Sequence, residues 1–194
     1  YEINFQELEQ QMAAGAKAIM LSSPHNPVGR VWTREELERM GQLAVQHDAY
    51  ILSDEIHADL VLPGQPQHIP IAAISEQIAE RSMVAMAPSK TFNVAGLSAS
   101  AIIIPDARLR ANYHHYLQAL HLGMGNIFGL AGLEAAYNNG HEWLNQMLAY
   151  IQGNLDWMTK ELETHLPQVK VIEPEATYLA WLDFRALGMQ DKEL

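Results

Sequence analysis

The segment from Ala87 to Leu97 constrains the chain most, because it places a lysine directly after a buried strand. The apolar run 82–87 predicts that strand, and Lys90 follows it between a proline and several small residues. Lysine is seldom fully buried, so an ammonium among such neighbours is expected to be partly desolvated. Desolvation lowers a lysine pKa and frees the amine as a nucleophile, as Schiff-base chemistry requires. A lysine that extends its ammonium to water is the alternative.

Two other segments of polar and turn-forming residues stand at the ends of predicted strands. They are 23–30, with the sequence Ser-Pro-His-Asn-Pro-Val-Gly-Arg, and 53–60, with the sequence Ser-Asp-Glu-Ile-His-Ala-Asp-Leu. In open α/β sheets, ligand-binding groups collect at the carboxyl ends of parallel strands. The three segments are therefore expected to lie at one edge of a sheet.

Alternating strand and helix patterns predict an α/β fold with a mainly parallel sheet flanked by helices. The second helix is expected to begin with a capping box formed by Thr33 and Glu36. Strands are expected at 17–21, 50–53, 82–87 and 99–104, and helices at 5–14, 33–47 and 71–80.

The second half of the chain is predominantly helical in its pattern. Helices are expected at 106–120, 127–138 and 142–165, and strands at 169–172 and 178–184. These two strands indicate the start of a smaller α+β C-terminal domain. We place the boundary near Gly153, which divides the chain into part of a large domain (1–153) and the start of a small one (154–194). Tyr178 and Trp181 alternate along the last strand and are expected to provide core and surface packing.

Charge and composition exclude several classes of function. The chain has 12 basic and 23 acidic residues and a formal net charge of −11, which disfavours nonspecific binding to nucleic acid or an anionic membrane. It has no cysteine, so disulfides, thiolate metal sites and cysteine nucleophiles are excluded, and a cytoplasmic location is expected. Neither a membrane span nor a signal peptide is expected. His114, His115 and His121 lack the spacing of a metal site, so no metal is expected.

In order and spacing, the three polar segments resemble those of the pyridoxal-phosphate enzymes of the fold-type I aminotransferase superfamily. The Asn-Pro-x-Gly, Asp-Glu-Ile-His and Ser-Lys-Thr-Phe-Asn motifs carry the resemblance, and together they are highly specific. The nearest branch is that of the MalY/PatB-type cystathionine β-lyases, which are carbon–sulfur lyases. The resemblance covers essentially the whole chain and implies the central part of a longer enzyme.

The resemblance assigns roles to individual residues. It makes Lys90 the Schiff-base lysine and the general base at Cα. It makes Asp54 the carboxylate that keeps the pyridine nitrogen protonated, although a strand-end carboxylate or helix N-cap is the ordinary alternative. It gives Asn26 a hydrogen bond to the 3-oxygen of the ring. His57 stands where many aminotransferases have a tyrosine, which favours a cofactor role for His57 and a lyase over an aminotransferase.

Phosphate binding is expected to involve Ser89, with Thr91 and Ser98 as further candidates. A turn hydroxyl bonded to its own backbone is the alternative for Ser89. The superfamily often has a serine three residues before the lysine and an arginine eight residues after it, and this chain has Ala87 and Ser98 there. Part of the usual phosphate contact is therefore missing. Backbone amides or a neighbouring subunit would supply the rest.

The implied reaction is α,β-elimination on L-cystathionine or a related cysteine S-conjugate, giving a thiol, pyruvate and ammonia. A class I/II aminotransferase would use the same residues, and a regulatory or binding protein on the same fold is the alternative from another class. A homodimer with a small amino-acid substrate is expected from the resemblance.

Other residues near these motifs receive a more limited interpretation. Glu55 and Asp59 are interpreted as structural residues or as supports of the site. Arg30 and Arg110 lack a matching context, so neither is assigned to the substrate carboxylate. The glycine-rich segment 123–126 predicts a mobile active-site or interface loop.

Overall fold

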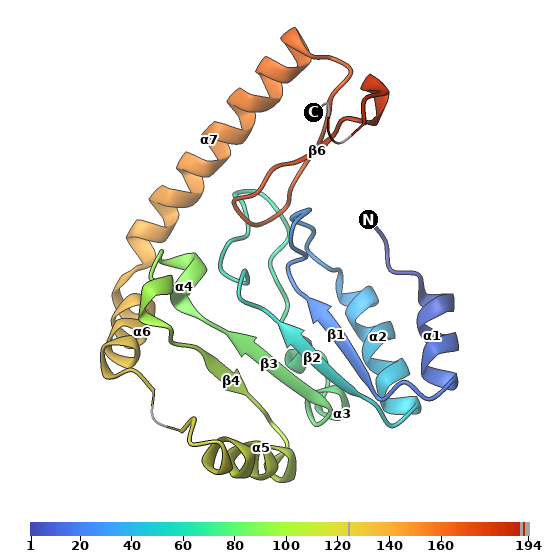
Figure 1. Cartoon of the computed structure of the whole chain (residues 1–194), viewed down its shortest axis with the longest axis vertical. Coiled ribbons are helices and arrows are strands. Elements are labelled where there is room, and N and C mark those ends of the chain that lie inside the picture. The colour runs from blue at the N-terminus through green and yellow to red at the C-terminus, as the bar shows by residue number, and fades with distance from the viewer. Residues whose placement is uncertain (124, 191, 193–194) are drawn as a thin grey trace.

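The centre of the molecule is a four-stranded sheet in the order β1-β2-β3-β4 (Figure 1). The computed structural model describes residues 1–123, 125–190 and 192. The three parallel strands are β1 (Ala18–Ser22), β2 (Tyr50–Asp54) and β3 (Ser82–Met86), and the antiparallel edge strand is β4 (Ala101–Ile103). The predicted mainly parallel α/β sheet flanked by helices is thus confirmed.

One face of this sheet carries the hydrophobic core. Side chains alternate across a strand, so Ile19 and Ile51 point to the same face, where both are buried. Met12, Leu37 and Ile78 pack against them, one from each helix of the covering layer. That layer consists of α1 (Phe5–Ala13), α2 (Arg34–Gln46) and α3 (Glu76–Ala79).

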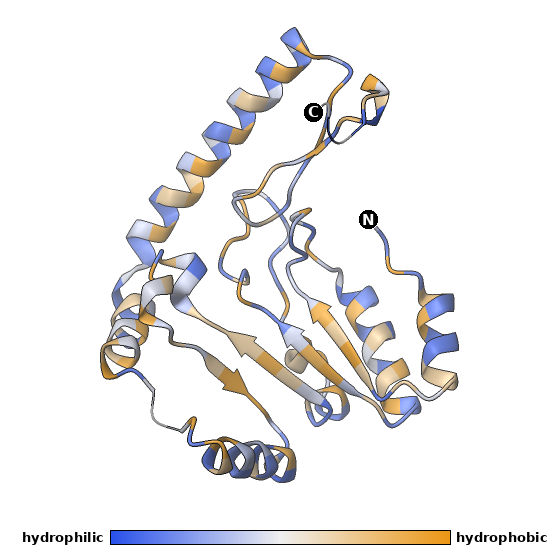
Figure 2. Ribbon diagram, in the orientation of Figure 1, coloured by the Kyte–Doolittle hydropathy of each residue, from blue (hydrophilic) through white to orange (hydrophobic). Residues whose placement is uncertain are grey.

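The opposite face of the sheet is apolar and open. Met20, Leu52 and Ile102 are 88%, 39% and 37% exposed there, and β1 and β4, which carry Met20 and Ile102, are largely orange in Figure 2. Parallel sheets usually have both faces covered. This face therefore differs from the opposite one in packing but not in polarity.

Helix boundaries follow local capping. The predicted capping box is confirmed: the Thr33 hydroxyl accepts from Glu36 N, and the Glu36 carboxylate accepts from Thr33 N at 2.9 Å. The single helix predicted over 71–80 is wrong. Ile71–Ala73 forms one short turn of 3₁₀ helix and α3 follows it, because the Ser75 side chain caps a new helix start.

The second half of the molecule consists of exposed helices. They are α5 (Ala107–Ala119), α6 (Ile127–Asn139) and α7 (His141–His165), close to the predicted ranges. In these three helices only Gly129 is buried. The predicted loop 123–126 contains Met124, which lies outside the described residues, and Asn126, which caps α6. None of the described helices is both long and apolar enough to cross a membrane.

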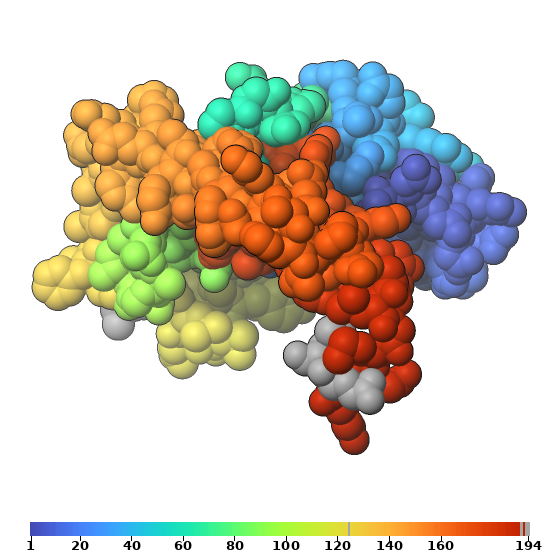
Figure 3. Space-filling model, turned by 90° about the horizontal axis from the view of Figure 1, so that it is seen from above, coloured from blue at the N-terminus to red at the C-terminus, as the bar shows by residue number. Residues whose placement is uncertain are grey.

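After α7 the chain forms a small antiparallel pair, β5 (Lys170–Ile172) and β6 (Trp181–Asp183), both shorter than predicted. Seen from above, α7 crosses the middle of the molecule, and the red segment after it projects to one side (Figure 3). The helix α7 continues through Gly153 without a break, and the domain boundary there stays a prediction.

Candidate active site

Three candidate residues stand at the carboxyl ends of adjacent parallel strands. Asn26 follows β1, Asp54 ends β2, and Lys90 follows β3 in the short helix α4 (Pro88–Thr91). Because the strands are parallel neighbours, these residues come to the same edge of the sheet (Figure 1). The charges of both Asp54 and Lys90 act on the pKa of His57, so both groups lie within electrostatic reach of this imidazole.

The turn that carries Asn26 is closed by backbone hydrogen bonds. His25 N donates to Arg30 O and Gly29 N donates to His25 O, both at 2.8 Å. Gly29 has a φ of +74°, a left-handed conformation that glycine adopts without strain. The Asn26 side chain is exposed at the tip of this turn, so its amide is available to a ligand.

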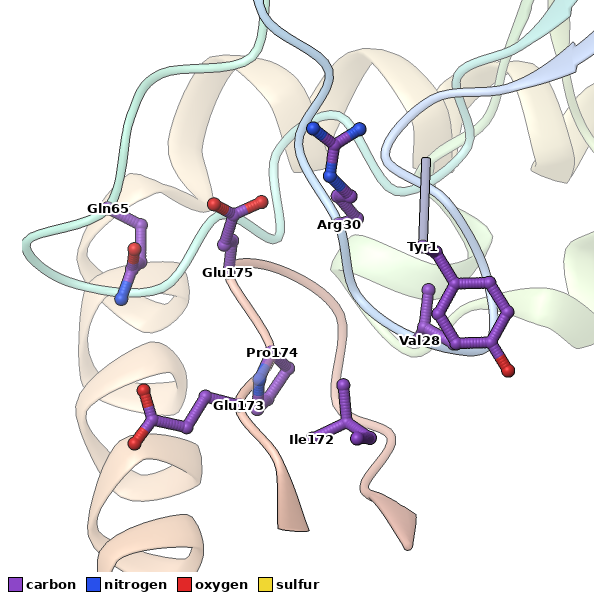
Figure 4. A pocket seen from close by; sticks show the side chains of 8 residues that line it. All are labelled: Tyr1, Val28, Arg30, Gln65, Ile172, Glu173, Pro174 and Glu175. Carbon is purple, nitrogen blue, oxygen red and sulfur yellow. The ribbon is translucent and has the colours of Figure 1, made fainter. Parts of the chain in front are cut away.

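A distant segment holds the same turn from its other side. Glu175 N and Ala176 N both donate to Gly29 O at 2.8 Å, and the Glu175 carboxylate accepts from Val31 N at 2.6 Å. A cavity of about 300 Å³ lies beside this contact. In Figure 4 Glu175 lies on the side of Arg30, whereas Glu173 points away. The segment 173–177 thus joins the C-terminal part of the chain to the Asn26 turn.

Asp54 is exposed and borders a cavity of about 480 Å³ on the open face of the sheet. Its carboxylate accepts from Ile56 N at 3.2 Å, which fixes the side chain without enclosing it. The cavity is largely apolar and is lined by Leu52, Met83 and Ala87, among others. An apolar cavity with a few polar groups at its rim is typical of small-molecule sites.

The neighbouring carboxylate, Glu55, is fully buried and makes structural hydrogen bonds. It accepts hydrogen bonds from the Ser53 hydroxyl at 2.9 Å and from Ile71 N at 3.0 Å, and His68 Nε2 lies 2.9 Å from its other oxygen. These contacts tie the loop before Ile71 to the end of β2. They agree with the interpretation of Glu55 as structural.

His57 is buried beside the site. Burial lowers the pKa of its imidazole, the charge of Asp54 raises it, and the charge of Lys90 lowers it further. The ring stands edge-on to Tyr178, with 6.1 Å between ring centroids. Tyr178 precedes β6, so its predicted role as a packing residue of that strand is wrong. No local signal in the sequence indicates this contact, because the two residues belong to distant segments.

Lys90 is exposed, so the predicted desolvation of its ammonium is wrong for the described chain. The physical reason is its position: β3 ends at Met86, and α4 carries the lysine beyond the covered part of the sheet. Two flanking residues of α4, Pro88 and Thr91, are buried instead. The structure therefore anchors the backbone around Lys90 and leaves its amine accessible.

The three hydroxyls predicted near a phosphate differ in availability. Thr91 is fully buried and donates to the Asp59 carboxylate at 3.0 Å, so its candidacy is wrong. Ser89 is half-buried and Ser98 is exposed. Within the described part of the chain, neither of these two hydroxyls has a hydrogen-bond partner, so the turn hydrogen bond considered for Ser89 is not formed.

Curated relatives resemble the chain over most or all of its length. Cystathionine β-lyase PatB of Bacillus subtilis is 46% identical over 195 residues, covering 100% of this chain and 50% of that protein. Protein MalY of Escherichia coli is 35% identical over 179 residues, covering 92% of this chain and 45% of that protein. The chain spans about half the length of the curated relatives it matches.

Solved structures resemble it equally closely. The PLP-bound putative aminotransferase from Clostridium difficile 630 superposes with a TM-score of 0.95 at 40% identity, covering 100% of this chain and 49% of that one. The PLP-bound C–S lyase from Staphylococcus hominis gives a TM-score of 0.90 at 36% identity, covering 100% and 48%. The family profile for aminotransferase class I and II matches residues 1–194. The chain belongs to the aminotransferase class I and II family.

Proposed function

We propose that the chain is part of a pyridoxal-phosphate-dependent carbon–sulfur β-lyase. The observation that carries the proposal is the placement of Asn26, Asp54 and Lys90 at the carboxyl ends of three adjacent parallel strands. The 46% identity to a cystathionine β-lyase supports the choice of reaction. The net charge of −11 supports a small amino-acid substrate over a nucleic acid.

The donor set of this edge fits the proposed cofactor group by group. Lys90 presents an accessible amine for the aldehyde carbon, and Asp54 presents an accessible carboxylate for the pyridine nitrogen. Asn26 presents an exposed amide for the 3-oxygen of the ring. Ser89 is the proposed hydroxyl for the phosphate, and His57 stands beside the ring. When bound, pyridoxal phosphate acts as a sink for the electrons left by a broken bond.

In the proposed reaction Lys90 moves the proton. Its amine would take the proton from Cα of the substrate, and the ammonium so formed would give that proton to the leaving sulfur. The electron pair left at Cα would form the Cα–Cβ double bond as the Cβ–S bond breaks, and the sulfur would leave as the thiol. Hydrolysis of the remaining fragment gives pyruvate and ammonia. Asp54 favours proton loss because a carboxylate beside the pyridine nitrogen keeps that nitrogen protonated and the ring electron-poor.

The guanidinium groups of Arg30 and Arg110 each have partners within the described chain, although Arg30 Nη1 is buried without one. Arg30 contacts the Glu36 carboxylate at 2.9 Å and lies 4.6 Å from the centroid of the Trp32 ring. Arg110 donates to Ile104 O and Pro105 O. Neither guanidinium is therefore proposed to bind the substrate carboxylate.

The proposal is tested with the full-length protein and L-cystathionine. We expect thiol and pyruvate to form without a 2-keto acid acceptor. Replacement of the central amine in Lys90→Ala abolishes the reaction, whereas Lys160→Ala, on the exposed surface of α7, leaves it unchanged. Pyruvate formation by Lys90→Ala would contradict the proposed role of this residue.

An aminotransferase is the second candidate, favoured by the similarity to a PLP-bound putative aminotransferase. It would use the same lysine and carboxylate but return the proton to the cofactor side and require a keto acid. A strict requirement for a keto acid in the same assay would select this reaction over elimination. A regulatory or binding protein on this fold would show neither activity.

We also propose a homodimer in the cytoplasm. Ile127 and Phe128, at the start of α6, are 80% and 77% exposed, and such apolar surface is typical of an interface between subunits. Light scattering of the full-length protein tests the assembly: a dimeric mass is expected, and a monomeric mass would contradict the proposal.

A further inference from the structure

Asp59 connects the loop after β2 to the residue that follows Lys90. It lies five positions after Asp54, and its carboxylate accepts a hydrogen bond from the Thr91 hydroxyl at 3.0 Å. The Thr91 side chain is fully buried. A hydrogen bond to an ionised acceptor is roughly twice as strong as one between neutral groups. The carboxylate therefore holds the backbone of α4 at the position next to the lysine.

The same carboxylate has a second partner from a third element. The Tyr137 side chain, on α6, lies close enough to Asp59 for the carboxylate to act on the pKa of its phenol. Burial of the phenol and the negative charge of Asp59 raise the pKa of Tyr137 to about 12, so the phenol stays protonated at neutral pH. Its ring stands edge-on to Phe92, with 5.5 Å between centroids and 87° between planes.

These contacts enclose the backbone of Lys90 without touching its amine. Thr91 and Phe92 are fixed on one side of the lysine, and Phe92 N donates to Pro88 O at 2.9 Å across it. The Lys90 side chain remains exposed. A backbone held in place at Lys90 also limits where its exposed amine can lie. This matters for rate, because small displacements of a reacting atom slow a reaction.

We propose that Asp59 is a positioning residue that, through Thr91 and Tyr137, sets where the Lys90 amine stands relative to the cofactor. This inference rests on the proposed function. It gives Asp59 a task beyond general support of the fold, because the hydroxyl it binds is adjacent to the reactive lysine.

The test compares three variants of the full-length protein. Thr91→Val removes the hydroxyl at nearly constant volume, and Thr91→Ser restores a hydroxyl. Ser82→Ala is the matched control, because Ser82 is also fully buried and donates to Ile78 O at 2.6 Å, but at the opposite end of β3. Each protein is stripped of cofactor and mixed with pyridoxal phosphate, and the adduct is trapped with borohydride on the peptide that contains Lys90.

We expect Thr91→Val to slow adduct formation and to lower kcat by about tenfold or more, with KM changed by less than about twofold. Thr91→Ser recovers most of both losses. Ser82→Ala lowers the melting temperature but forms the adduct at the parent rate. In cofactor-free protein, amide exchange of the 88–97 peptide is faster in Thr91→Val than in Thr91→Ser.

Two outcomes separate this inference from the proposed function. If the parent forms the Lys90 adduct, and Thr91→Val forms it at the parent rate with the parent kcat, the positioning role is overturned while the proposed function stands. If the parent forms no adduct on Lys90, the proposed function is overturned and this inference with it.

Discussion

Many apolar side chains are buried in the sheet region (residues 1–104), whereas those of the helical region (α5, α6 and α7) are half-buried or exposed. In the sheet region Leu37, Ile51 and Ile71 are fully buried in one core. In the helical region Leu130 and Tyr150, on α6 and α7, are 58% and 71% exposed. Both regions have apolar residues at helical or strand spacing. Periodicity therefore predicts that an element forms, but burial also requires a partner element within reach.

The long helix α7 shows this most clearly. The helix predicted over 142–165 is confirmed, and an apolar stripe along one side of a helix usually faces a partner element. Within α7 no residue is buried, and Trp157 is 65% exposed. The sheet region is thus expected to determine the stability of the chain, and the helical region to contribute little to it.

The largest expected difference between the two regions is in the stability lost when a carboxylate is removed, and Glu55→Ala removes the buried one. It leaves His68, the Ser53 hydroxyl and Ile71 N without their shared acceptor, so the free energy of unfolding falls by about 3–5 kcal/mol. Glu161→Ala, whose carboxylate faces His165 on the surface of α7, costs about 0.5 kcal/mol or less. Denaturant unfolding of both variants measures the difference. Equal losses would contradict it.

Two leucines in helices provide a matched pair for packing. Leu37 in α2 is fully buried, whereas Leu130 in α6 is 58% exposed. Leu37→Ala lowers the free energy of unfolding by about 2–5 kcal/mol because it leaves a cavity. Leu130→Ala changes it by about 0.5 kcal/mol. A loss at Leu130 as large as that at Leu37, in denaturant titrations, would mean that α6 is packed in solution, as in the proposed homodimer.

Helix caps separate local from cooperative stability. Thr33 and Asn126 cap α2 and α6 through the same kind of hydrogen bond. Thr33→Ala lowers the free energy of unfolding, measured from the main unfolding transition, by about 1 kcal/mol. Asn126→Ala speeds amide exchange within α6 but leaves the main transition in place. A shift of that transition by Asn126→Ala would show that both regions unfold together.

The smallest expected effect concerns pH and the buried histidine of the sheet region. Burial lowers the pKa of His57 below its ordinary value of 6.5, so the unfolded chain takes up this proton at a higher pH than the folded chain. The stability from neutral His57 is therefore present above about pH 6.5 and is lost as pH falls through the lowered pKa. His57→Gln flattens the decline in melting temperature between neutral and acidic pH. If the melting temperature of the variant fell with pH as steeply as that of the parent, this contribution would be excluded. Part of the fall that remains in the variant is expected from His25, because burial lowers its pKa too.

Sequence alone predicts the features that depend on neighbouring residues. The parallel strands, the Thr33–Glu36 capping box and the three polar segments at strand ends all have local signals. The break of the helix at Ser75 also has a local cause, since serine is a strong N-cap, but the apolar pattern across 71–80 conceals it.

The features that sequence alone did not predict depend on contacts between distant segments. The Glu175 carboxylate binds Val31 N across 144 positions, and the ring of Tyr178 packs on His57. No periodicity connects such pairs. The exposure of Lys90 likewise depends on where α4 stands relative to the sheet edge, which composition around the lysine does not determine.

The central claim is that Lys90 binds pyridoxal phosphate, and covalent trapping tests it most directly. The full-length protein is mixed with pyridoxal phosphate, reduced with borohydride, digested and mapped by mass spectrometry. The account predicts a visible absorption band that reduction abolishes, and the reduced cofactor on the peptide that contains Lys90. A protein that takes up no cofactor, or that carries it on another lysine, would contradict the account.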